Sequence, residues 1–197
     1  MPETVSLARE ITATAWLLLP LLAGALVHGL CMQHGWLGFL ARPIDGDRSW
    51  RGRPIFGHSK TFRGPVCVGA GTAAGFALQH ELLARIDALA AIVPIDPASI
   101  PWWLGAAAGA AAELSELPNS FVKRRLGIAP GDTARGPLSV VFYLWDQLDL
   151  LLGYWLVLAP AVPATATRVA ASLILVGSLH PLTTLAGYLL GMRPTAR

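Results

Sequence analysis

The sequence predicts an all-α integral membrane protein. Of its 197 residues, 54% are apolar and only 14% are charged, about half the charged share of a typical soluble domain. Its mean hydropathy is +0.53, and several stretches approach the ~20 apolar residues that a helix needs to cross the hydrocarbon core. This composition excludes an ordinary cytosolic enzyme, a disordered chain and a disulfide scaffold. We expect a single domain over residues 1–197.

Five stretches are long and apolar enough to be membrane spans. In chain order they cover residues 11–30, 64–80, 101–117, 137–159 and 169–191. The second is rich in glycine and alanine, so we expect it to pack closely against other helices. A further apolar segment, 89–93, is too short to span and is expected at the membrane interface.

The basic residues are unevenly distributed over the predicted loops. Loop 33–63 carries six, loop 118–136 carries four and the C-terminal tail carries two, together 12 of the 15 Lys and Arg residues. With five spans these twelve share one side of the membrane, and only three lie on the other: Arg9, Arg85 and Arg168. Because basic loops stay in the cytoplasm, we expect the N-terminus outside the cell membrane. The C-terminus and two functional loops are then cytoplasmic.

Acidic residues form two pairs in or beside the predicted spans: Glu113 with Glu116, and Asp146 with Asp149. Each pair is spaced i, i+3 and is expected on one helix face. Like charges this close repel unless a cation lies between them or one group is protonated. We therefore expect Asp146, Asp149 and Glu116 to bind Mg²⁺, which prefers carboxylate oxygens and shares its shell with substrate phosphates. Alternatively, these carboxyl groups are protonated or lie at the membrane interface, and this alternative is strongest for Glu113.

Two basic loops adjoin these acidic helices and have the composition of phosphate-binding segments. The first supplies positive charge from Lys60 and Arg63, a hydroxyl from Thr61 and a nearby glycine that allows close backbone approach. The second contains a triple basic run after a serine. Together they predict a polyphosphate bound with a metal. The candidate substrate-binding residues are Arg53, Thr61, Arg63, Ser120, Arg124 and Arg125, and the candidate catalytic residues are Lys60, Lys123, Asp146 and Asp149.

Three motifs, in this order and spacing, resemble the CDP-archaeol synthase family, which is related to the phosphatidate cytidylyltransferases. They are Gly57-x-x-Lys60-Thr61-Phe62-Arg63-Gly64, then Ser120-x-x-Lys123-Arg124-Arg125-Leu126-Gly127-Ile128 with Pro130-Gly131, then Asp146-Gln147-Leu148-Asp149. The resemblance extends over residues 42–153. Glu116 stands where the family usually has aspartate. The link 137–146 is longer than expected, so it either buries the aspartates roughly 13 Å deep or forms an interfacial stretch.

The resemblance implies an enzyme with five spans that transfers a cytidylyl group from CTP to a membrane lipid phosphate and releases pyrophosphate, with Mg²⁺ as cofactor. By this resemblance Asp146 and Asp149 hold the metal. The four cations Lys60, Arg63, Lys123 and Arg124 contact phosphates, and the hydroxyls of Thr61 and Ser120 orient oxygens. The acceptor is an archaeal-type ether lipid phosphate or a phosphatidate-like lipid. Membrane lipids are the other expected partners, a homo-oligomer is compatible with the sequence, and no nucleic acid is expected.

Two other functions fit part of the sequence. A small proton- or ion-coupled transporter would use the intramembrane carboxylates as a relay, but it has no need of the lysine-containing loops. A non-catalytic membrane subunit would use the basic loops to bind anionic lipid, but it does not need the aspartates. The transferase uses both sets of residues and is the leading hypothesis.

Overall fold

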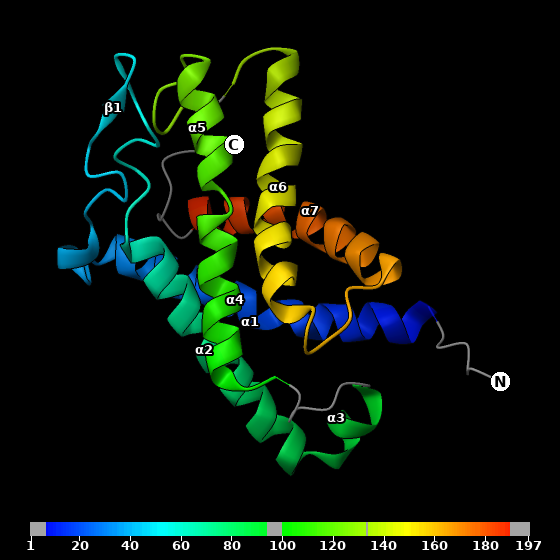
Figure 1. Cartoon of the computed structure of the whole chain (residues 1–197). Coiled ribbons are helices and arrows are strands. Elements are labelled where there is room, and N and C mark those ends of the chain that lie inside the picture. The colour runs from blue at the N-terminus through cyan, green and yellow to red at the C-terminus, as the bar shows by residue number, and fades with distance from the viewer. Residues whose placement is uncertain (1–6, 94–99, 133, 190–197) are drawn as a thin grey trace.

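The computed structural model describes residues 7–93, 100–132 and 134–189, which are mostly helical (Figure 1). The long helices are α1 (Leu7–Gln33), α2 (Arg63–Arg85), α4 (Trp102–Leu114), α6 (Pro137–Leu158) and α7 (Ala166–Leu189). The short elements are the 3₁₀ turn η1 (Gly38–Leu40), α3 (Asp87–Ile92), α5 (Leu117–Arg125) and the strands β1 (Ser49–Trp50) and β2 (Arg53–Pro54). The strands form an antiparallel hairpin in which Trp50 lies opposite Arg53.

Helix α2 is central, because it packs against both α1 and α4, and α6 packs on the other side of α4. Helix α7 contacts α1 and α6. In Figure 1, α5 continues upward from the end of α4 alongside the first turns of α6, and the hairpin stands beside α5. One end of the bundle therefore gathers α5, the beginning of α6 and the loop that precedes α2.

Small residues bring α2 close to its two neighbours, as the composition of the second predicted span indicated. A Cβ atom added at Gly71 would lie 2.7 Å from Gly24 Cα on α1. Towards α4, a Cβ at Gly109 would lie 2.5 Å from Thr72 Oγ1 and 2.8 Å from the Val68 carbonyl oxygen. Helix backbones can approach this closely only where side chains are minimal.

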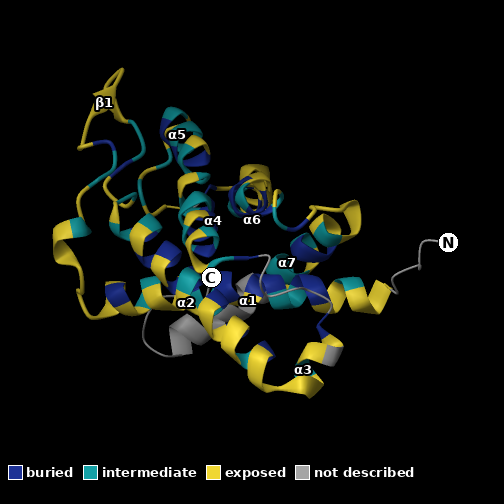
Figure 2. Cartoon of the chain, turned by 60° about the horizontal axis from the view of Figure 1, so that its bottom comes forward, coloured by how far each residue is buried: buried dark blue, intermediate teal, exposed yellow. Residues whose placement is uncertain are grey.

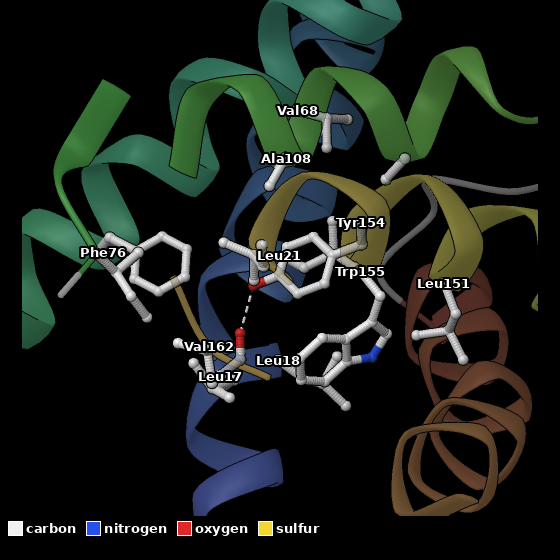
Figure 3. Packing of buried hydrophobic residues seen from close by; sticks show 13 residues of the cluster. Leu17, Leu18, Leu21, Val68, Phe76, Ala108, Leu151, Tyr154, Trp155 and Val162 are labelled. Atoms are coloured by element: carbon white, nitrogen blue, oxygen red, sulfur yellow. Dashed lines mark hydrogen bonds between the residues drawn. The ribbon is translucent and has the colours of Figure 1, made fainter. Parts of the chain in front are cut away.

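The apolar core lies where α1, α2, α4 and α6 meet (Figure 3). Leu17 and Tyr154 are completely buried there, and the Tyr154 hydroxyl donates a hydrogen bond to the Leu17 carbonyl. Away from this core the helices expose large apolar side chains, including Leu152 at 67% and Leu156 at 73% exposure. Figure 2 shows the exposed residues along the outward sides of the helices and the buried residues on the sides that face one another. Outward-facing apolar side chains of this kind suit a surface that contacts lipid rather than water.

Among the described residues, two helices, α1 and α6, are long and apolar enough to cross a membrane. Helix α2 extends five residues beyond the predicted second span, and the short segment 89–93 overlaps α3. The last predicted span corresponds to α7 as far as Leu189. Its final residues and the two tail arginines, Arg193 and Arg197, lie outside the described residues.

The predicted span 101–117 ends early. Helix α4 stops at Leu114 after 13 residues, which is about 20 Å of helix against a hydrocarbon core of about 30 Å. Pro118 accounts for the interruption, because its ring lacks an N–H and would clash with the carbonyl four residues earlier. The expectation that Glu113 and Glu116 share one helix is therefore wrong: Glu113 belongs to α4, and Glu116 lies in the turn before α5.

The long link between Pro137 and Asp146 is helical. It forms the first turns of α6, where Leu138, Val140 and Val141 are exposed. Asp146 therefore lies about 13 Å along the helix axis from Pro137, rather than after a separate interfacial stretch.

Candidate active site

The two aspartates of α6 are joined to α5 through a buried amide. Asn119 is 1% exposed, and its Nδ2 donates hydrogen bonds to Asp146 Oδ1 at 2.6 Å and to Asp149 Oδ2 at 2.9 Å. Lys123, one turn further along α5, places Nζ 2.6 Å from Asp146 Oδ1. Sequence reasoning missed Asn119, although its i, i+4 spacing from Lys123 places both on one face of α5.

The oxygens around Asn119 fit a hard divalent cation. Two carboxylates converge on this amide, and the Asn119 Oδ1 atom is buried without a hydrogen-bond partner among the described residues. Carboxylate and amide oxygens are the ligands that Mg²⁺ accepts from proteins. Within the described part of the chain, however, no group of three or more His, Cys, Asp or Glu side chains could hold a metal ion. Glu116 thus does not form a three-carboxylate cluster with Asp146 and Asp149.

Glu116 is instead paired with Lys60, which arrives from the loop before α2. Both side chains are about three-quarters buried. Burial lowers the pKa of Lys60, but the charge of Glu116, and then those of Glu113 and Asp149, outweigh this effect and hold its pKa above the ordinary value. Lys60 is therefore a cation at neutral pH, paired with Glu116.

The basic loop over residues 42–62 is closed at its base by backbone pairing. Pro43 and Thr61 form an isolated β-bridge, the Ile44 N–H donates to the Lys60 carbonyl at 2.8 Å, and the Phe62 N–H donates to the Arg42 carbonyl at 3.1 Å. This pairing fixes Lys60 and Thr61 directly before α2. Arg63 is the first residue of α2, and its guanidinium contacts the Met32 sulfur at the end of α1.

Ser120 and Arg124 are buried on α5, at 8% and 5% exposure. Arg124 Nη1 lies 3.5 Å from the Phe56 carbonyl oxygen, and a Cβ atom at Gly57 would lie 3.2 Å from the same nitrogen. The Arg124 Nε atom has no hydrogen-bond partner among the described residues. A buried guanidinium with spare donors beneath a basic loop is suited to an anionic ligand.

Arg53 and Arg125 have a different environment from the one predicted. Arg53 donates to the carbonyls of Arg124 and Arg125, and Arg125 donates to those of Trp50, Arg53 and Pro54. The Arg125 guanidinium also lies over the Phe121 ring, 5.0 Å from its centroid. In this structure the two arginines fasten the β1–β2 hairpin to α5.

Glu113 lies apart from the aspartates, between three helices. Its Oε1 is 3.8 Å from His28 Nδ1 on α1, and its Oε2 would be 2.7 Å from a Cβ atom at Gly64 on α2. It is nevertheless near enough to contribute to the negative potential at Lys60.

Comparison with known proteins places these residues in context. A family model described as CarS-like, CDP-archaeol synthase, matches residues 7–196. Curated relatives named CDP-archaeol synthase include one from Halobacterium salinarum, 35% identical over 162 residues, which are 77% of this chain and 81% of the relative. Another, from Hyperthermus butylicus, is 32% identical over 185 residues, 90% of each chain.

The fold of this chain is also similar to that of a solved structure. It is described as an intramembrane enzyme for archaeal membrane lipids biosynthesis, and it matches with a TM-score of 0.55 at 26% identity. The match covers 87% of this chain and 94% of the solved one. The helical architecture is therefore shared with a protein that works within a membrane.

Proposed function

Because the chain belongs to the CDP-archaeol synthase family, we propose that it transfers a cytidylyl group from CTP to a lipid phosphate in the membrane. The observation that carries this proposal is the pairing of two lysines with carboxylates at one end of the bundle: Lys60 with Glu116, and Lys123 with Asp146. Asp149 adds to the negative potential at Lys60. The names of the relatives favour an archaeal-type ether lipid phosphate as the acceptor.

In the proposed reaction, an oxygen of the lipid phosphate attacks the α-phosphorus of CTP. A new phosphorus–oxygen bond forms, the bond from the α-phosphorus to the bridging oxygen breaks, and pyrophosphate leaves. A phosphate oxyanion is already a nucleophile, so the reaction needs no strong general base. Catalysis then rests on positioning and charge stabilisation, as in other phosphoryl transfers. Lys60, Lys123 and Arg124 supply the positive charge, and Ser120 and Thr61 supply hydroxyl donors.

Asp146 and Asp149 would hold Mg²⁺, since their oxygens converge at the Asn119 amide. When bound, the ion would neutralise charge on the phosphate oxygens. Asn119 keeps both carboxylates in one orientation, and Lys123 neutralises part of the charge of Asp146. These contacts offset the repulsion between two carboxylates that face the same space.

We further infer that the chain crosses the cell membrane five times, with the N-terminus outside and the basic loops in the cytoplasm. The 13-residue α4 is then a short third crossing, which α5 continues. The positive loops support this orientation. So does the gathering of the loop before α2, α5 and the start of α6 at one end of the bundle (Figure 1). CTP is a cytoplasmic metabolite, so a site at this face is accessible to both the nucleotide and the lipid headgroup.

The test is a direct assay of the purified protein with labelled CTP, Mg²⁺ and a panel of ether- and ester-linked lipid phosphates. We expect CDP-lipid and pyrophosphate in equal amounts, with preference for the ether lipid. Asp149→Asn should abolish turnover, whereas Asp87→Asn, on the exposed surface of α3, should not. If no lipid phosphate yields CDP-lipid, the proposal is wrong. Proton movement across proteoliposomes without CTP would instead favour the transporter.

A further inference from the structure

Asp45 is a buried carboxylate to which the proposed reaction assigns no role. It is 8% exposed, and it accepts three backbone hydrogen bonds. The N–H groups of Phe56 and Gly57 donate to Oδ2 at 2.8 and 3.1 Å, and the Asp47 N–H donates to Oδ1 at 3.0 Å. Burial raises the pKa of Asp45, but these hydrogen bonds outweigh it and hold the pKa below its ordinary value. The side chain is thus an ionised anchor inside the basic loop.

The anchor is connected to Lys60 through a single residue. The Gly57 N–H donates to Asp45, and the Gly57 carbonyl accepts the Lys60 N–H at 3.1 Å. On the other side, the Lys60 carbonyl accepts the N–H of Ile44, the residue before Asp45. The N–H and the carbonyl of Lys60 are therefore both hydrogen-bonded to residues next to the Asp45 carboxylate: Gly57, which binds it, and Ile44, which precedes it in the chain.

The same anchor places the loop on α5. The carbonyl of Phe56, whose N–H binds Asp45, faces Arg124 Nη1. Gly57 has a φ of 101°, and a Cβ there would lie 2.5 Å from Pro130 Cγ. Only glycine allows both this backbone conformation and this approach.

The loop needs such an anchor because its backbone is locally unfavourable. Asp47 and Arg51 have positive φ values of 56° and 52°, a left-handed conformation that is unfavourable for residues with a side chain. A carboxylate that accepts several backbone N–H groups makes charge-assisted hydrogen bonds, which are roughly twice as strong as neutral ones. Asp45 can therefore hold a conformation that the local sequence does not favour by itself.

We propose that Asp45 is a positioning residue that holds the basic loop so that Lys60 is presented to the nucleotide phosphates. The effect of Asp45 on nucleotide binding rests on the proposed cytidylyl transfer, whereas its role in holding the loop does not. Asp45→Asn keeps the size of the side chain and replaces one acceptor oxygen with an NH₂ group, so in either orientation of the amide at least one of the three N–H groups loses its acceptor. Asp47→Asn is the matched control, because it removes the same charge from the same loop at an exposed position and keeps its backbone N–H.

The first measurement does not depend on activity. Limited trypsin digestion of the full-length protein reports the opening of the loop, because Arg48 and Arg51 are exposed within it. We expect Asp45→Asn to be cut at these two positions several-fold faster than the wild type, and Asp47→Asn to be cut at the wild-type rate. Equal cleavage of Asp45→Asn and wild type would overturn the anchoring role, whether or not the chain makes CDP-lipid.

The second measurement separates positioning from general stability. For Asp45→Asn we expect the KM for CTP to rise about tenfold, with the KM for the lipid phosphate and the thermal midpoint unchanged. Gly57→Ala, which disturbs the same link to Lys60, should also raise the KM for CTP. A fall in kcat alone, with a wild-type KM for CTP, would contradict the positioning role. If the wild type itself makes no CDP-lipid, the proposed function fails while the trypsin comparison still decides whether Asp45 holds the loop.

Discussion

The contact between α4 and α6 is closest at Gly153, and it offers a sharp test of the packing beside the site. A Cβ atom added there would lie well under 3.0 Å from the Ala111 carbonyl oxygen and 2.5 Å from Ser115 Oγ. The Ser115 hydroxyl also donates to the Asp149 carbonyl at 2.6 Å. A substitution at Gly153 therefore disturbs the helix pair at the turn that carries Asp149.

The effect of Gly153→Ala is the difference of two opposing contributions. Alanine in a helix interior is favoured over glycine by about 1 kcal/mol, whereas overpacking typically costs 1–3 kcal/mol. The obstacle at Gly153 includes a backbone carbonyl, which no change of rotamer can move. Relief requires the two helices to separate by roughly 1 Å, because carbon–oxygen contacts this short are strongly repulsive. We therefore expect the upper end of the overpacking cost, and a net destabilisation of about 1–2 kcal/mol.

Thermal unfolding of the detergent-solubilised protein, followed by tryptophan fluorescence, measures this change. Gly177→Ala is the matched control, since a Cβ there meets nothing within 4 Å and should leave stability equal or slightly increased. Turnover should also fall in Gly153→Ala, because Asp149 moves with the helix. A Gly153→Ala protein as stable and active as wild type, or a Gly177→Ala protein equally destabilised, would refute the packing argument.

Three further predictions concern contacts away from the reacting groups. Tyr154→Phe removes the buried hydroxyl that donates to the Leu17 carbonyl and should lower stability by about 1 kcal/mol, measured by thermal unfolding, without changing the KM for CTP. Arg125→Lys keeps the charge but loses the guanidinium fork that reaches several carbonyls, so trypsin should cut the hairpin faster than in wild type. Arg168 donates to Glu10 at 2.9 Å in a mostly buried pair. Glu10→Gln keeps an acceptor oxygen but removes the charge, so it should cost roughly 1–3 kcal/mol, and a double-mutant cycle with Arg168→Gln should show coupling.

The sequence singled out the charged residues of the candidate site, but not the neutral residue that supports them. Asp146, Asp149, Lys60 and Lys123 were identified because charged residues beside apolar helices are rare and therefore conspicuous. Asn119 was missed because a neutral amide in a polar stretch attracts no such attention. Its role follows from two hydrogen bonds to residues that are distant in the sequence, and no local pattern encodes them.

The arginines show that charge and position in the sequence do not distinguish residues with different environments in the fold. Charge and position made Arg53 and Arg125 resemble Arg124, and all three were expected to bind substrate. In the fold, Arg124 is buried beneath the basic loop, whereas Arg53 and Arg125 donate to backbone carbonyls between the hairpin and α5. Arg124 and Arg125 are consecutive on α5 and therefore face different sides of the helix. Arg53 reaches α5 from β2, a contact between residues distant in the sequence that no local pattern encodes.

The interruption between α4 and α5 is therefore part of how the site is built. A continuous helix through residue 117 would place Glu113 and Glu116 on one helix, about one turn apart. The turn instead places Glu116 against Lys60 and lets α5 begin anew beside α6. Three elements then contribute groups to the same end of the bundle: the loop before α2 supplies a cation, α5 an amide and a second cation, and α6 the two aspartates. Since these groups lie on separately anchored elements, their mutual geometry depends on the anchors as much as on the charges.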